Sequence, residues 1–235
     1  MVINAGMYTY KFDYLMHPWM LETLSDHFQN GATLEIGCFE GRMSSLLLER
    51  FDDLVIVEPM IENIEAARVV APNAVFNHCK IEDFVSMTRF QNIFLIHTLE
   101  HIQEDVKTLT AIQSLLGKGG RLFVVVPNAN AASRQIAAAG GIIASTKCVT
   151  ESEKRHGHFR TYDLDDLKHC VGMAGMTTVA DGGIFFKGLA NFQLDQAIEA
   201  GIIGPEYLKG CLELGKKQPE LCSSIYVVCE VPRET

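Results

Sequence analysis

The sequence contains no run of basic residues and no apolar stretch long enough to cross a membrane. Its 20 Lys and Arg are outnumbered by 29 Asp and Glu, which gives a formal net charge of −9. Surfaces that follow the phosphates of nucleic acids need clustered Lys and Arg, and a membrane helix needs about 20 consecutive apolar residues. We therefore expect neither a nucleic-acid partner nor a membrane partner.

Paired cysteines are also missing. The seven cysteines are scattered and never spaced as C-x-x-C, a pattern that argues against both a disulfide framework and structural zinc. The first residues, Met1 to Gly6, lack the charged and apolar regions of a secretory signal. We therefore expect a reduced, cytoplasmic protein.

The stretch from Thr33 to Gly41 is the most informative part of the chain. It reads Thr-Leu-Glu-Ile-Gly-Cys-Phe-Glu-Gly, an apolar strand that carries an acid and opens into a glycine turn. The residues from Arg42 to Arg50 have apolar side chains at helical spacing and predict a helix. A strand, a glycine turn and a helix in this order point backbone N–H groups into a crevice.

An acid follows the next predicted strand, Leu54 to Val57. This acid is Glu58, which lies 23 positions after Glu35. An acid about 20 residues beyond such a glycine turn commonly accepts hydrogen bonds from the hydroxyls of a ribose. The two segments together predict a site for a nucleoside.

The glycine spacing separates two classes of nucleotide cofactor. The dinucleotide pattern G-x-G-x-x-G brings a pyrophosphate against bare backbone, but Phe39 and Arg42 occupy its second and third glycine positions here. A nucleoside without phosphates avoids that conflict. The sequence Glu35-Ile-Gly37-Cys-Phe-Glu-Gly41 resembles E/D-x-G-x-x-x-G, the first motif of the class I S-adenosylmethionine-dependent methyltransferases.

Four later segments resemble motifs of this family and occur in the expected order. They lie at the predicted exits of the third and fourth strands, along the fifth strand and before the last helix: residues 76–84, 94–102, 115–128 and 158–164. The second of them ends in Leu-Glu-His-Ile, and the last reads His-x-Arg-x-Tyr. The resemblance covers roughly Ala32 to Phe186.

The alternation of strands and helices from Ala32 to Asn128 predicts a parallel sheet covered on both faces. The resemblance implies a Rossmann-like, doubly wound α/β fold whose seven-stranded sheet is mostly parallel with one antiparallel edge strand. The segments Thr177 to Phe186 and Ser223 to Val231 alternate as strands and are the candidates for that edge. A chain of 235 residues with 48% hydrophobic content predicts one domain.

We divide residues 1–235 into four functional parts. They are a helical cap over 1–30, a cofactor-binding core over 31–128, a candidate lid over 129–161 and a helical insertion over 187–221. The candidate lid is long and weakly patterned, which in a compact domain indicates a functional or mobile connection. The insertion is a candidate substrate cover or homodimer contact.

The resemblance implies that S-adenosylmethionine is the cofactor. The residues expected to bind it lie at the strand exits and near the amino terminus: Glu35, Gly37, Cys38, Phe39, Gly41, Glu58, Pro59, Ile81, Glu82, His97 and Tyr10. The side chains of Tyr8, Tyr10 and Tyr14 resemble the tyrosines that cap the cofactor in antibiotic-sugar N,N-dimethyltransferases. The alternative is that these rings anchor the first helix to the core.

Methyl transfer from a sulfonium depends mostly on holding the acceptor atom in line with the methyl group. A hydroxyl acceptor must also lose a proton to a general base, whereas an amine acceptor only has to be neutral. The candidate catalytic residues are therefore the histidines near the crevice: His101, His158 and His97. The alternative for each of them is a hydrogen-bonded structural role. The candidate acceptor-binding residues are Tyr8, His156, Arg160 and Tyr162. The alternative for Arg160 is an ion pair with a nearby aspartate.

The segment His97-Thr-Leu-Glu100-His101 also admits a metal hypothesis. It is similar to the E-x-L-E-H segment of ubiquinone-pathway O-methyltransferases, whose two acids and histidine are associated with a divalent cation. The first position here is His97, and imidazole suits zinc or iron better than magnesium. The favoured alternative is that Glu100 and His101 begin a helix, so the sequence assigns no metal site.

The segments 183–191 and 219–229 resemble small methyltransferases of surface-polysaccharide and nucleotide-sugar pathways. This resemblance favours a small-molecule acceptor, with O-methylation of a sugar or a nucleotide-linked intermediate as the first hypothesis. N-methylation of an amino sugar or amine stays open, and so does a non-catalytic partner subunit that only binds the cofactor.

Overall fold

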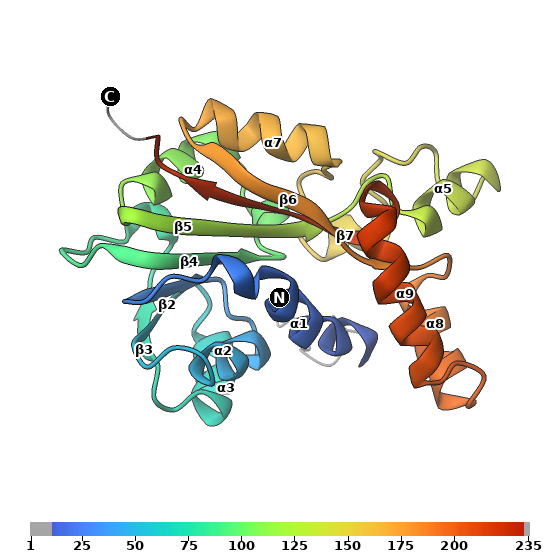
Figure 1. Cartoon of the computed structure of the whole chain (residues 1–235), viewed down its shortest axis with the longest axis horizontal. Helices are drawn as coiled ribbons and strands as arrows, with labels where there is room; N and C mark the ends of the chain where they lie inside the picture. The colour runs from blue at the N-terminus through green and yellow to red at the C-terminus, as the bar shows by residue number, and fades with distance from the viewer. Residues whose placement is uncertain (1–10, 233–235) are drawn as a thin grey trace.

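The computed structural model describes residues 11–232 and places seven strands in one sheet (Figure 1). Their order across the sheet is β3-β2-β1-β4-β5-β7-β6. The strands are β1 (Thr33–Ile36), β2 (Leu54–Glu58), β3 (Val75–His78), β4 (Phe90–Ile96), β5 (Leu116–Pro127), β6 (Thr177–Phe186) and β7 (Cys222–Glu230). Within this sheet β7 runs antiparallel to both of its neighbours. The predicted fold class is confirmed, with β6 and β7 forming the antiparallel edge pair.

Helices cover both faces of the sheet. The α-helices are α1 (Lys11–Leu24), α2 (Arg42–Leu48), α3 (Ile61–Val70), α4 (Asp105–Gln113), α5 (Ala132–Ala139), α6 (Glu151–Arg155), α7 (Leu164–Met173), α8 (Asn191–Glu199) and α9 (Pro205–Lys217). Short 3₁₀ helices are η2 (Ser25–His27), η3 (Ile81–Asp83), η4 (Leu99–His101) and η5 (Pro219–Leu221). No helix in the described part of the chain has the length and apolar character of a membrane span.

Side chains that alternate along the strands build one hydrophobic core on each face. On β4, Ile93 and Leu95 belong to the core shared with α4 and α7, whereas Phe94 belongs to the core shared with α1 and α2. The Phe94 ring stacks on Phe123 of β5 with 4.6 Å between ring centroids. Figure 1 accordingly shows α4 and α7 on one side of the sheet and α1, α2 and α3 on the other.

The sheet has a topological switch point between β1 and β4. The chain runs from β1 outward to β2 and β3 and then returns to β4 on the other side of β1. The carboxyl ends of parallel strands share one edge, and ligands of such sheets bind at that edge beside the switch point. The edge brings together the glycine turn after β1, Glu58 at the end of β2 and His97 directly after β4.

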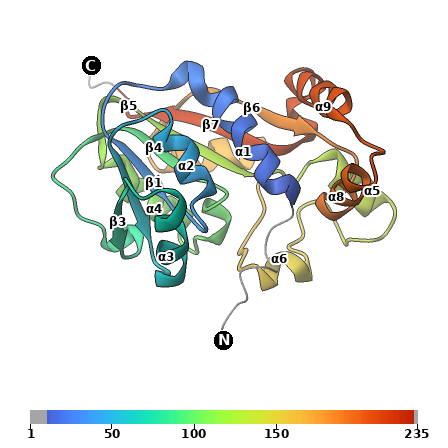
Figure 2. The same cartoon turned by 90° about the horizontal axis from the view of Figure 1, so that it is seen from below.

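The segment between β6 and β7 is helical, in agreement with its sequence pattern, and its helix α8 lies next to α1 in both views (Figures 1 and 2). The other helix, α9, packs against β6. Asp195 of α8 accepts hydrogen bonds from the backbone N–H groups of Lys11 and Phe12 at 2.9 and 2.8 Å. The first N–H groups of a helix have no partner inside it, so α8 holds the start of α1. Roles as a substrate cover or homodimer contact stay predictions.

The segment proposed as a lid contains α5 and α6. The guanidinium of Arg134 on α5 donates to the carbonyls of Thr146 and Cys148 at 2.8 and 2.5 Å and pairs with Glu153 of α6. Thr150 and Glu153 close a capping box at the start of α6. The side chain of Arg134 therefore joins the two helices into one packed unit, and a lid function stays a prediction.

Replacing Gly41 by alanine should destabilise the fold more than the same change at Gly119. Both glycines have positive φ angles, 78° and 75°, so both variants carry the same backbone strain. A Cβ at Gly41 would lie 2.7 Å from the backbone Cα of Ala67 on α3. A Cβ at Gly119 would have no neighbouring heavy atom within 4 Å. We expect Gly41→Ala to lose about 1–3 kcal/mol more in urea unfolding, the range for overpacking. Equal losses would show that α2 and α3 do not need this close approach.

Candidate active site

The carboxylate of Glu58 is the centre of the predicted ribose side of the crevice. It accepts hydrogen bonds from the backbone N–H of Cys38 at 3.0 Å, the backbone N–H of Met60 at 2.9 Å and the amide of Asn63 at 3.1 Å. Glu58 is only 4% exposed. The Cys38 thiol is a further, weak donor, with its Sγ 3.8 Å from Oε2 of Glu58. A carboxylate offers about four lone-pair sites, and the one that faces this thiol is the one that suits a ribose hydroxyl. The arrangement fits the nucleoside that the sequence predicts.

Gly37 is required by the protein itself. Its φ is 78°, and a Cβ there would lie 2.7 Å from Oγ1 of Thr98. Thr98 follows β4, and its hydroxyl donates to the carbonyl of Ile36 at 3.1 Å. The glycine thus lets the exits of β1 and β4 meet at the switch point. The sequence pattern gave no signal for Thr98, because the contact joins segments about 60 residues apart.

Glu35 points toward α2. Its carboxylate accepts a hydrogen bond from the hydroxyl of Ser44 at 2.5 Å, and the side chain is 2% exposed. Burial raises the pKa of Glu35 to about 8, and the nearby Glu58 adds to the rise, while the Ser44 bond opposes it. The predicted cofactor-binding acid is therefore a buried, protonated group at neutral pH. Ser44 was not among the predicted site residues.

Helix α1 is attached to the glycine turn. The Tyr14 hydroxyl donates to Glu40 at 2.7 Å, and the Arg42 guanidinium lies 5.2 Å from the centre of the Tyr14 ring. His17, one turn later, has a buried Nδ1 without a hydrogen-bond partner among the described residues. Burial and the Arg42 charge lower the pKa of His17 to about 4. Tyr8 and Tyr10, the predicted capping tyrosines, lie outside the described residues.

His97 follows β4 with a positive φ of 48°. Its Nε2 lies 3.0 Å from the hydroxyl of Ser224 on β7. Burial lowers the pKa of His97 to about 3, and the imidazole of His17 contributes to the lowering. His97 is therefore neutral at neutral pH. Its ring is turned toward β7 and lies near α1, a position that the sequence did not predict.

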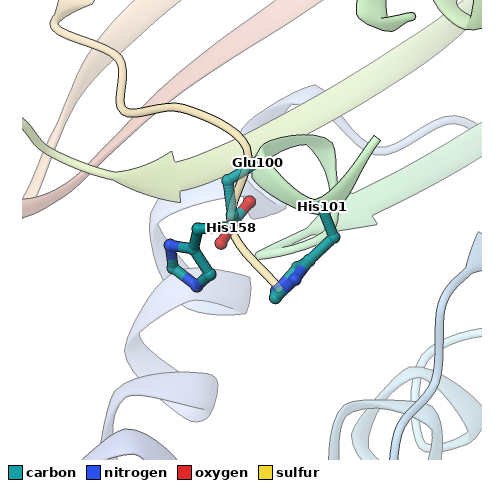
Figure 3. Close-up of side chains that lie close together, drawn as sticks. All are labelled: Glu100, His101 and His158. Atoms are coloured by element: carbon teal, nitrogen blue, oxygen red, sulfur yellow. The ribbon is translucent and has the colours of Figure 1, made fainter. Parts of the chain in front are cut away.

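Two other predicted histidines come together. The rings of His101 in η4 and His158 after α6 meet edge to face with 4.6 Å between centroids, beside the carboxylate of Glu100 (Figure 3). The backbone N–H of Phe159 donates to the carbonyl of Glu100 at 2.9 Å and joins the two segments. Burial and the His101 ring lower the pKa of His158 to about 4. His101 is exposed and His158 is partly buried.

The predicted acceptor residues Arg160 and Tyr162 are bound to a helix start. Arg160 pairs with Asp105 in the first turn of α4 and also donates to the carbonyl of Gln103 at 2.6 Å. The Tyr162 hydroxyl donates to the same Asp105 at 2.7 Å. These contacts favour the ion-pair alternative for Arg160. The remaining predicted acceptor residue described here, His156, is partly buried at the end of α6.

The other predicted cofactor residues flank the exits of β2 and β3. Pro59 is exposed directly after Glu58, and Ile81 is buried in η3. Glu82 in η3 is exposed and accepts a hydrogen bond from the Thr108 hydroxyl of α4 at 2.6 Å. Phe39, in the glycine turn, has a positive φ of 46° and is partly buried.

Replacing Glu35 by glutamine should flatten the pH dependence of stability above neutrality. The pKa of Glu35 is higher in the folded chain, so the folded state keeps a proton that the unfolded state releases. The free energy of unfolding therefore falls as pH rises toward about 8. We expect Glu35→Gln to make the slope between pH 6.5 and 8 shallower by up to about 1.4 kcal/mol per pH unit, measured by urea unfolding. Glu65→Gln, at an exposed site on α3, is the control, and an unchanged slope in Glu35→Gln would contradict the burial argument.

Solved structures with this fold are similar over almost the whole chain. The N-methyltransferase NodS of Bradyrhizobium japonicum, solved with S-adenosyl-L-homocysteine, is 14% identical with a TM-score of 0.58, covering 97% of this chain and 91% of its own. A possible histamine N-methyltransferase of Thermotoga maritima is 15% identical with a TM-score of 0.66, covering 94% of both chains. A putative methyltransferase of Haloferax volcanii, solved with the activator Trm112, is 12% identical with a TM-score of 0.62, covering 95% of this chain and 94% of its own. At these identities the likeness shows the fold.

Sequence comparison identifies the family. No curated protein matches the chain in sequence. A family model described as a methyltransferase domain matches residues 8–181, which include the exits of β1, β2 and β4 and the histidine pair. This match confirms the prediction of a methyltransferase and, with it, of S-adenosylmethionine as cofactor. The chain belongs to the methyltransferase domain family.

Proposed function

We propose that the protein methylates a hydroxyl of a polar small molecule, a sugar or a nucleotide-linked intermediate, with S-adenosylmethionine as donor. The observation that carries this proposal is the pairing of a ribose-type acid on one side of the switch point with uncharged imidazoles on the other. Glu58 ends β2, and His97 and His101 follow β4. An acid for the nucleoside and a proton acceptor for the hydroxyl are the two requirements of O-methylation.

The cofactor side would rest on Glu58 and the glycine turn. The Glu58 lone pair that faces only the weak Cys38 thiol donor suits a ribose hydroxyl. The bonds from the backbone N–H groups of Cys38 and Met60 keep the carboxylate in place. Buried Ile81, after β3, supplies apolar surface beside this edge. S-adenosylmethionine, when bound, supplies an electrophilic methyl group on a sulfonium sulfur.

The acceptor side would rest on the histidine pair. The hydroxyl proton passes to a ring nitrogen of His101, the exposed member of the pair. His158 packs edge to face against it and orients the ring. His97 is less suited to this role because its Nε2 is already bonded to Ser224.

N-methylation of an amino sugar or amine is the second candidate. NodS and the Thermotoga maritima relative are both described as N-methyltransferases, and an amine acceptor needs no base. A third candidate is a subunit that binds the cofactor without turnover. The Haloferax volcanii relative was solved in complex with an activator protein, which keeps a protein partner among the outcomes to be tested.

Glu58→Ala should weaken binding of S-adenosylmethionine by about 1.5–3 kcal/mol, the range for a hydrogen bond to a charged group. Isothermal titration calorimetry measures this directly, and thermal melting reports whether the glycine turn has loosened. Glu62→Ala, at an exposed position of α3, is the control and should bind normally. Unchanged affinity in Glu58→Ala would place the nucleoside elsewhere.

His101→Ala should lower kcat by about 100-fold or more, the usual contribution of a positioned base, while cofactor affinity stays unchanged. The assay offers two matched acceptors, a nucleotide-linked sugar with free hydroxyls and its amino-sugar counterpart, and locates the new methyl group by mass spectrometry. His169→Ala, on the exposed face of α7, is the control and should keep full activity.

Two outcomes would overturn the proposed O-methylation, and one would overturn only the role of His101. Methylation of the amino sugar with full activity in His101→Ala would establish the N-methyltransferase. Methylation of the hydroxyl with full activity in His101→Ala would remove the histidine from the chemistry. Tight cofactor binding without turnover on any acceptor would favour the partner subunit.

A further inference from the structure

Three side chains at the acceptor side of the crevice form a compact set of metal-ligating groups. They come from two segments: Glu100 and His101 lie in η4, and His158 follows α6. One carboxylate oxygen and one nitrogen from each ring all lie within 4.8 Å of one another. Figure 3 shows the Glu100 carboxylate lying between the two rings in that view. Sequence spacing could not reveal this set, because 57 positions separate His101 from His158.

Glu100 is the member of the set that needs an explanation. Its side chain is 2% exposed, and its Oε2 has no hydrogen-bond partner among the described residues. Leaving a buried polar atom without a partner destabilises the fold, and native structures rarely keep one without a reason. The carboxylate is therefore held where a positively charged ligand would satisfy it.

Among residues 11–232, no lysine or arginine forms an ion pair with this carboxylate. Arg134, on the neighbouring segment, pairs with Glu153 instead. Glu153 adds further negative charge near Glu100. Each of the two imidazoles has a nitrogen that can offer a lone pair to a metal.

We infer that Glu100, His101 and His158 bind a first-row divalent transition cation such as zinc. Two imidazoles and one carboxylate are typical ligands of zinc and of iron(II), whereas magnesium prefers oxygen ligands alone. The ligand set differs from the one that the chain's resemblance suggests. His97 is bonded to Ser224 and lies outside the set, and His158 takes the third place.

A cation with three protein ligands keeps an open position. Because the set lies where β4 ends, beside the switch point, that position would be available to an acceptor oxygen. There the cation would lower the pKa of a bound hydroxyl, and the hydroxyl proton would pass to water instead of to the His101 ring. This catalytic role rests on the proposed function, whereas cation binding does not.

The test is a binding measurement on the full chain after removal of metal by a chelator. Zinc and cobalt(II) are titrated by calorimetry, and cobalt(II) is also followed by its visible absorption, which reports its ligands. We expect one cation per chain and no comparable binding of magnesium. Glu100→Gln and His158→Ala should each weaken zinc binding by more than about 100-fold, beyond the effect of outer-shell partners. His169→Ala, away from the set, should bind as the unmodified chain does.

A second readout separates lost binding from lost folding. Glu100→Gln keeps the size of the side chain and removes a buried ionisable group, so the metal-free variant should melt at or above the temperature of the metal-free parent. Zinc should raise the melting temperature of the parent and not that of Glu100→Gln. No stoichiometric zinc binding, or equal binding in both variants, would overturn the inference.

The outcome is independent of the methyl-transfer test. Zinc binding without turnover on any acceptor would leave the metal site standing and overturn the proposed function. Hydroxyl methylation by a chain that binds no zinc would overturn the metal site and support the proposed function, with the His101 imidazole as the base. Activity that falls on metal removal and returns with zinc would support both.

Discussion

The carboxylate of Glu58 joins the two turns that form one wall of the crevice. It accepts backbone N–H groups from the turn after β1 and from the turn after β2, at Cys38 and Met60. A buried carboxylate is stable only with such donors, so the position of the acid and the shape of the turns depend on each other. The close approach of Gly37 and Thr98 joins the exits of β1 and β4 in the same way. Together they fix the switch point on which the rest of the site is built.

Burial decides the charge of the groups around this crevice. It raises the pKa of Glu35 and of Glu100 to about 8 and lowers those of His97 and His158 to about 3 and 4. Two acids and two bases are therefore uncharged in the same region at neutral pH. Such a region accepts a proton or a cation without first breaking an ion pair. Chemistry that moves positive charge, as methyl transfer from a sulfonium does, is suited to this environment.

Helix α1 connects the crevice to the helical insertion. Its first N–H groups are held by Asp195 of α8, and Tyr14 is bonded to Glu40 in the glycine turn. His17 on the same helix contributes to the electrostatics of His97. The insertion therefore holds one end of the helix whose Tyr14 is bonded to the glycine turn.

The sequence alone predicted the alternation of strands and helices from Ala32 to Asn128, the glycine turn after β1 and the acid at the end of β2. Strand periodicity placed β6 at Thr177–Phe186, where the structure has it, because alternation is a local property of the chain. Only the tertiary structure decided that Glu35 faces Ser44, that Arg160 pairs with Asp105 and that Glu100, His101 and His158 converge. The last two contacts join segments more than 50 positions apart, and their side chains meet because packing brings those segments together. A local pattern of apolar and polar residues cannot predict such a contact between side chains.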